Sequence, residues 1–180
     1  MDLKNKKSLH AIYEKIVYLI PNQQKTLINS FKVHSDQDLE LLEILAEHII
    51  CLVGNNLEDY IRSYQWMLGI FKEELFYFIK NNKYRISTFK KAYEEIYSNS
   101  SYMEKYMQGL LLSQLIWPNH AKSFLHFYKF IEKINKNFNY LEIGPGRGLY
   151  LALVGKSDFC KKIEAWDVSN ESLKQTKESV

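Results

Sequence analysis

The first part of the chain, up to about residue 137, has apolar residues at the spacing of amphipathic helices. Near its start, Ile12, Ile16, Leu19 and Ile20 fall on one helical face, and Pro21 closes this segment. Similar patterns and capping residues predict further helices at about residues 23–31, 36–53, 57–79, 88–97, 100–117 and 118–134. This part of the chain is therefore predicted to be helical.

The period of the pattern changes at Phe138. The short apolar segment Tyr140–Ile143 is typical of a strand, and it runs at once into the glycine-rich sequence Gly144–Gly148. Residues 149–154 then return to a helical pattern. The order of strand, sharp turn and helix indicates the beginning of a βαβ unit.

A second unit of the same kind follows. Lys162–Val168 is predicted to be a strand, and Asn170–Ser179 is predicted to be a helix. A β-α-β-α order is typical of the opening of a doubly wound parallel sheet. We therefore expect a mainly α, helical N-terminal domain over residues 1–137, followed over residues 138–180 by an incomplete α/β, Rossmann-like domain.

Composition excludes several classes of protein. Apolar residues make up 46% of the chain and charged residues 25%, the balance of a globular protein. The net charge of +3 is small and its lysines are interspersed with acidic residues, so no nucleic-acid partner is expected. Cys51 and Cys160 match no metal-ligand spacing, and a reduced, cytoplasmic setting is expected. No apolar run approaches the ~20 residues of a membrane span, so no membrane partner is expected either.

The three glycines of the turn have a physical purpose. A strand that turns sharply into a helix points backbone N–H groups at a ligand, and glycine permits both positive φ and close approach. The dinucleotide-binding fingerprint would place its third glycine at position 149, where this chain has Leu149. The spacing of Gly144, Gly146 and Gly148 therefore disfavours a nicotinamide enzyme.

The sequence Glu142-x-Gly-x-Gly-x-Gly resembles motif I of the class I S-adenosylmethionine-dependent methyltransferases. The resemblance covers about Asn139–Lys177, and it implies S-adenosylmethionine as cofactor. It places Glu142 near the ammonium group of the cofactor. The turn residues that would border the amino-acid part are Gly144, Pro145, Gly146 and Gly148.

The end of the second predicted strand supports this interpretation. Asp167 follows the turn by about 20 residues, and an acidic side chain at this place can accept hydrogen bonds from both ribose hydroxyls. By resemblance, Val168 and Ser169 would lie near the adenine. A glycine-rich turn alone could be purely structural, but the β-α-β order and Asp167 favour the cofactor fold.

The segment 102–120 resembles the helix that precedes motif I in methyltransferases that act on small molecules. Tyr102, Tyr106 and Gln114 are candidate cofactor contacts, with core or interface packing as the alternative for the tyrosines. His120 is a weak candidate for a general base, with a hydrogen-bonded structural role as its alternative. Catalytic residues are otherwise unknown, and no metal site is expected.

These features predict the N-terminal part of a methyltransferase that transfers a methyl group to a small-molecule acceptor. A complete domain of this family has a larger sheet than two strands, so we expect a truncated chain that is inactive alone. A homodimer through the helical domain is a further expectation. The alternative is a non-catalytic helical interaction or oligomerisation protein that carries a truncated methyltransferase fold.

Overall fold

A long helical region comes first in the structure. The structure is a computed structural model and describes residue 3 and residues 5–179. The helical elements are α1 (Lys7–Leu19), η1 (Pro21–Gln23), α2 (Gln24–Lys32), α3 (Asp36–Val53), η2 (Gly54–Asn56), α4 (Leu57–Asn81), α5 (Phe89–Ala92), η3 (Tyr93–Tyr97), α6 (Ser100–Ile116) and α7 (Pro118–Ile131). None of the helices in the described part of the chain combines the length and the apolar character that crossing a membrane requires.

Local capping chemistry sets several of these helix ends. The Ser35 side chain accepts a hydrogen bond from the Asp38 backbone N–H, and the Asp38 side chain bonds back to the Ser35 N–H, which forms a capping box for α3. The Asn99 side chain caps α6 by accepting a hydrogen bond from the Tyr102 N–H. Pro118 lies in the first turn of α7, where its missing N–H costs nothing.

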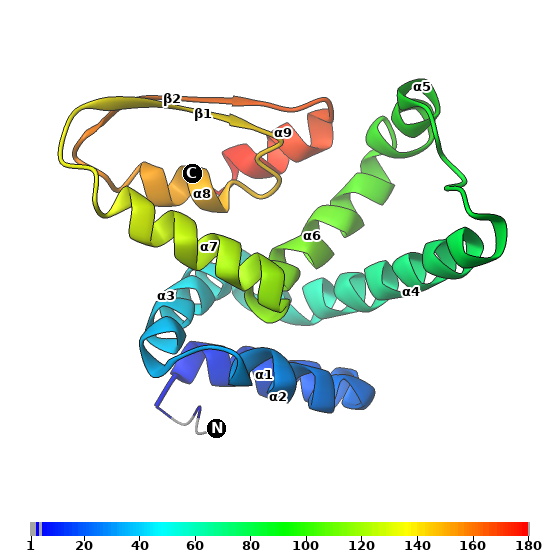
Figure 1. Cartoon of the computed structure of the whole chain (residues 1–180), viewed down its shortest axis with the longest axis horizontal. Coiled ribbons are helices and arrows are strands. Elements are labelled where there is room, and N and C mark those ends of the chain that lie inside the picture. Colours follow the sequence, from blue (N-terminus) through cyan, green and yellow to red (C-terminus); the bar gives the residue numbers. More distant parts are fainter. Residues whose placement is uncertain (1–2, 4, 180) are drawn as a thin grey trace.

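A short segment with two parallel strands alternating with helices follows the helical region. Its elements are β1 (Phe138–Ile143), α8 (Leu149–Val154), β2 (Cys160–Trp166) and α9 (Asn170–Lys177). The two strands pair in parallel, with Tyr140 opposite Ile163 and Ile143 opposite Trp166. Helices α8 and α9 lie on one side of this pair (Figure 1). The sequence therefore predicts both the helical first part and the β-α-β-α order correctly.

The other face of the strand pair carries exposed apolar side chains. Leu141 is 47% exposed, Ile143 75% and Trp166 60%. Successive side chains of a strand point to opposite faces, so these three residues share the face away from α8 and α9. The covered face instead carries the partly buried Tyr140 and Glu142.

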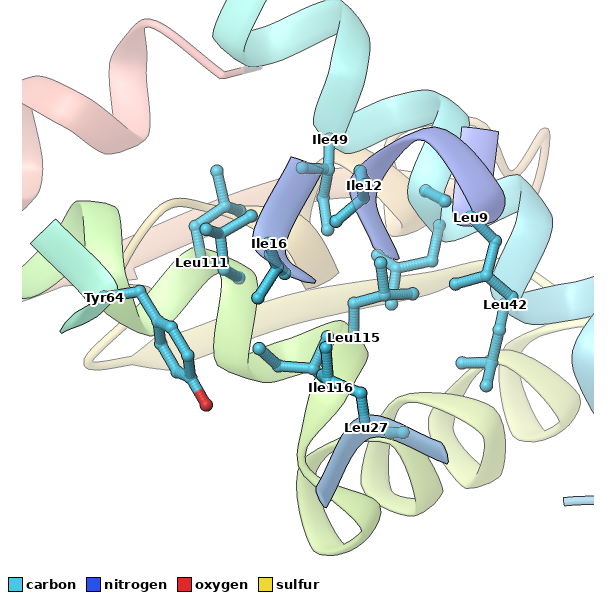
Figure 2. Packing of buried hydrophobic residues seen from close by; sticks show 14 of the residues in the cluster. Leu9, Ile12, Ile16, Leu27, Leu42, Ile49, Tyr64, Leu111, Leu115 and Ile116 are labelled. Carbon is cyan, nitrogen blue, oxygen red and sulfur yellow. The ribbon is translucent and has the colours of Figure 1, made fainter. Parts of the chain in front are cut away.

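The core lies between α1, α3 and α6. Ile12, Ile49 and Leu115 are fully buried there, and Figure 2 shows side chains from these helices meeting in one cluster. The same cluster of buried residues extends to Leu149 of α8, and Tyr150 packs against it. The β-α-β-α segment is thus attached to the helical core by apolar contacts.

Helix α4 is buried along its first half only. The apolar periodicity runs on through Leu75 and Ile79, but no side chain in the fully described stretch 68–102 is buried. In Figure 1, the far parts of α4 and α6 extend away from the rest of the chain and are joined through α5. We call residues 68–102 the arm. Its apolar stripe lies outside the core.

Helices α4 and α6 approach each other closely at Gly109. A Cβ atom built there would lie 3.0 Å from the Ser63 carbonyl oxygen and 3.1 Å from Tyr64 Cα. Both neighbours are backbone atoms, which cannot swing aside as the end of a flexible side chain can. The absence of a side chain at Gly109 therefore sets the distance between these two helices.

We predict that Gly109→Val lowers the free energy of unfolding by about 2 kcal/mol, because the new side chain must force α4 and α6 apart. Gly69→Val is the matched control, since Gly69 also lies in a helix but a Cβ atom there meets nothing within 4 Å. Urea unfolding followed by circular dichroism measures both. Equal stability of the two variants would show that the close approach at Gly109 does not matter.

Candidate functional site

The turn between β1 and α8 is built by three glycines in the left-handed region. The φ angles are 73° at Gly144, 58° at Gly146 and 72° at Gly148. Other residues adopt such angles only at a cost, and Pro145 between them fixes its own φ. The turn closes through a 2.8 Å hydrogen bond from the Gly148 N–H to the Pro145 carbonyl oxygen. A Cβ atom at Gly144 would meet nothing within 4 Å, so the turn is open on this side.

Helix α9 packs against the back of the turn and holds it in place. The Thr176 hydroxyl donates a 2.8 Å hydrogen bond to the Gly146 carbonyl oxygen. A Cβ atom at Gly148 would lie 3.1 Å from Thr176 Cγ2, so only glycine allows this contact. The glycine at position 148 therefore serves packing against α9 as well as the turn.

Arg147 is a buried charge within the turn that the sequence analysis did not identify. Its side chain is 6% exposed and points at α9, where Nη1 donates to Gln175 Oε1 at 3.0 Å and lies 3.5 Å from Glu178 Oε2. Its guanidinium also lies 5.7 Å from the centre of the Tyr60 ring. Its Nε has no hydrogen-bond partner among the described residues. The feature of the sequence that could have identified Arg147 is its position as a single arginine within a glycine-rich turn.

A hollow of about 100 Å³, open to solvent, lies between α6 and the glycine-rich turn. It brings together four residues predicted as cofactor contacts: Glu142, Gly144, Pro145 and Gly146. Gln114 of α6, the fifth predicted contact, lines the opposite wall. The remaining lining residues are Met107, Leu110, Leu111, Arg147, Leu149 and Tyr150. A mostly apolar hollow with a few polar groups is typical of a small-molecule site.

Glu142 is the titratable group of this hollow. Burial raises its pKa to about 7, although the Tyr140 hydroxyl donates a 3.2 Å hydrogen bond to its Oε2 and opposes the shift. Glu142 forms no ion pair with any described residue. The raised pKa of Tyr140, which burial causes first and the carboxylate beside it second, keeps the phenol protonated as a donor. A cationic ligand would supply the partner that Glu142 lacks.

Asp167 lies next to the turn at the end of β2. The Gly144 N–H donates to the Trp166 carbonyl oxygen at 2.8 Å, which places the following residue, Asp167, beside Gly144. The Asp167 carboxylate accepts hydrogen bonds from the Ser169 N–H at 2.8 Å and from the Ser172 hydroxyl at 2.6 Å. Both bonds orient the carboxylate at the start of α9. Val168, the predicted adenine contact, is 50% exposed beside it.

Tyr102 and Tyr106 do not line the hollow. The Tyr102 ring lies 5.0 Å from the Trp66 ring, and the Tyr106 ring lies 6.3 Å from the Phe71 ring, both on α4. The step of eight residues from Tyr106 to Gln114 rotates the helix by roughly 80°. The tyrosines therefore face α4 while Gln114 faces the turn, which agrees with the packing alternative given for them.

His120 lies outside the lining of the hollow but contacts Gln114. Its Nδ1 is 3.0 Å from the Ser113 hydroxyl and 3.5 Å from Gln114 Nε2, and its ring packs 5.0 Å from Trp117. Burial lowers its pKa, so the imidazole is neutral at physiological pH. The His120 imidazole therefore contacts the side chains of both Ser113 and Gln114.

Comparisons of the chain with models of protein families, with curated proteins and with solved structures find no match. Within the described residues, no group of three or more His, Cys, Asp or Glu side chains is arranged to hold a metal ion. The chemistry of the site therefore has to be argued from the geometry of the turn, the hollow and the carboxylates of Glu142 and Asp167.

We predict that the protein becomes less stable as the pH rises from about 4.5 to about 7, through Glu142. Its pKa of about 7 in the fold is above the unfolded value of 4.5, so the fold favours the protonated acid. This stabilisation is fully present below the unfolded pKa and is lost as the pH rises through the folded pKa. After allowance for partial solvation, the loss is about 2 kcal/mol.

Urea unfolding at several pH values, compared between the wild type and Glu142→Gln, isolates this contribution from other titrating groups. The difference in free energy of unfolding between the two proteins should change over this pH range. A difference that does not vary with pH would show that the Glu142 carboxyl is not perturbed.

Proposed function

We propose that the chain binds S-adenosylmethionine at the turn between β1 and α8 and belongs to a methyltransferase that acts on a small molecule. One observation supports this most: the hollow joins an unpaired carboxylate, Glu142, to an open glycine turn. A second carboxylate, Asp167, lies on the adjacent strand end. In the proposed binding mode, Glu142 would face the ammonium group of the cofactor and Asp167 would face its ribose hydroxyls.

The residues present fit this cofactor chemically. An open glycine turn lets backbone groups approach a ligand closely, and Gly144 has free space where a side chain would be. Glu142 forms no ion pair with the residues that the structure describes, and Arg147, the nearest basic residue in sequence, contacts Gln175 and Glu178 at the end of the chain's last helix. The amino-acid part of the cofactor would therefore meet a free carboxylate at Glu142.

When bound, S-adenosylmethionine supplies an electrophilic methyl group on a sulfonium. The protein's contribution is then mainly to position the nucleophile and to exclude water. Glu142 holds the ammonium end, Asp167 holds the ribose, and Gln114 limits the hollow from the side of α6. His120, neutral at physiological pH, fixes the Gln114 amide through its Nδ1. No strong base is required by this division of roles.

We predict that the protein binds S-adenosylmethionine and its demethylated product, and that Asp167→Asn weakens binding about tenfold. The substitution removes a charged acceptor for the ribose hydroxyls but keeps an oxygen for the Ser169 N–H. Ser172→Ala is the matched control, because it removes a local partner of Asp167 and leaves the carboxylate in place. Isothermal titration calorimetry measures all three proteins.

Absence of binding to the wild-type protein would refute the proposal. Equal affinities of the Asp167→Asn and Ser172→Ala proteins would instead remove Asp167 from the site, because both changes disturb the same turn and only one removes the charge.

We also expect the affinity for S-adenosylmethionine to rise about tenfold between about pH 6 and about pH 8. Glu142 has a pKa of about 7 in the free protein, and a bound ammonium group favours its charged form, so binding releases a proton below that pKa. The same titration with Glu142→Gln should show weaker binding and lose this pH dependence. An unchanged pH profile would mean that Glu142 does not face the cationic end.

A non-catalytic interaction protein is the second candidate, and one observation favours it. The arm has no buried side chain, and it exposes large apolar residues. Exposing them to water does not stabilise an isolated chain. Such a surface is typical of a protein that associates through its helical region. Binding of S-adenosylmethionine would decide between the candidates, since the interaction protein has no need of it.

A further inference from the structure

The exposed half of α4 carries an apolar stripe that the fold leaves uncovered. Leu75 is 57% exposed, Phe76 59% and Ile79 68%. Leu75 and Ile79 are four residues apart and lie on one helical face, with Phe76 beside them. Monomeric proteins rarely expose large apolar side chains as a contiguous group, so this stripe is expected to contact another surface.

Two charged residues of opposite sign flank the stripe. Glu73 lies seven residues before Lys80, which is about two helical turns. Both side chains therefore project from the same flank of the helix. Both are exposed, and neither forms an ion pair with another described residue. The neighbouring Glu74 is engaged in a 3.2 Å ion pair with Arg85, and Lys72 Nζ lies 5.8 Å from the centre of the Phe76 ring. Glu73 and Lys80 are therefore available to a partner.

The positions of these charges make the surface complementary to itself. A two-fold axis at the level of Phe76 and Tyr77, perpendicular to α4, would bring a second copy of the helix alongside in the antiparallel direction. Residues equally far from the axis then face each other, so that Leu75 of one copy meets Ile79 of the other. Glu73 of each copy then lies opposite Lys80 of the other, on the same flank of the interface.

We propose that the arm is a self-association surface, through which two copies of this chain pair by antiparallel packing of the second halves of their α4 helices. In this interface, the stripe of Leu75, Phe76 and Ile79 in one copy packs against the same stripe in the other copy. Two Glu73–Lys80 ion pairs between the copies align the helices. This inference is independent of the proposed cofactor site, because the surface shares no residue with it. It gives the helical region a role of its own.

A second copy fits this surface better than other occupants. A membrane surface would favour basic residues alone along the flank, whereas Glu73 and Lys80 carry opposite charges. A partner of one charge sign would leave either Glu73 or Lys80 facing a like charge. Only an occupant with the reversed order of charges satisfies both, and the antiparallel copy of the helix has that order.

The experiment uses the full chain in sedimentation-velocity ultracentrifugation over a wide range of protein concentration. The wild type should reach a dimer, and Ile79→Glu should abolish it without loss of helical circular dichroism, because Ile79 is exposed. Glu73→Lys and Lys80→Glu should each weaken dimerisation about tenfold, since each places like charges opposite each other at two symmetric positions. Glu47→Lys, at an exposed position of α3, is the matched charge control and should leave the dimer unchanged.

The decisive measurement mixes the two charge-reversed proteins. Glu73→Lys pairs with Lys80→Glu in a heterodimer that has opposite charges at both positions, so the mixture should associate about as well as the wild type. The double variant Glu73→Lys/Lys80→Glu should likewise recover self-association. The proposal would be overturned if the wild type stayed monomeric up to its solubility limit. It would also be overturned if Ile79→Glu and both charge reversals left dimerisation unchanged.

Discussion

Burial of the second half of α6 on nearly all of its sides is the constraint from which the rest of the structure follows. Leu111, Leu112 and Ser113 are at most 1% exposed although they point in different directions around the helix, which is typical of a helix surrounded by others. The glycine at position 109 lets α4 come into backbone contact on one side. On another side, the same helix supplies Gln114 to the wall of the hollow. Helix α6 therefore belongs to the core and also forms one wall of the site.

The glycine turn separates two charges that would otherwise neutralise each other. Glu142 precedes the turn and Arg147 lies within it, and although both line the hollow, their hydrogen-bond partners belong to different elements. Gln175 and Glu178 hold the guanidinium on α9, while the carboxylate stays in the hollow with Tyr140 as its only described hydrogen-bond partner. Burial raises the pKa of Glu142, and no described residue forms an ion pair with it that would lower the pKa. The turn thus keeps a carboxylate available for a cation from outside.

Most helix boundaries and the strand–turn–helix order could be predicted because their causes are local. The capping of α3 by Ser35 and the glycines of the turn act within a few residues. The division of α4 into a buried and an exposed half could not be predicted, because apolar spacing gives the face of a helix but not the length over which other elements cover it. The grouping of Tyr106 with Gln114 overlooked the roughly 80° between them on the helix, and the structure shows Tyr106 packing on α4 and Gln114 facing the turn. The partners of Arg147 lie on α9 and are visible only after folding.

The open face of the strand pair has a practical consequence. The chain contains three tryptophans, and they lie in three different surroundings. Trp66 packs against a tyrosine ring, and Trp117 donates its indole N–H to the Tyr64 hydroxyl at 2.9 Å. Trp166, at 60% exposure, lies on the open sheet face next to Asp167. The fluorescence of Trp166 therefore reports on this face of the strand pair. Any molecule that covers the face changes the polarity around Trp166, while the surroundings of Trp66 and Trp117 stay the same.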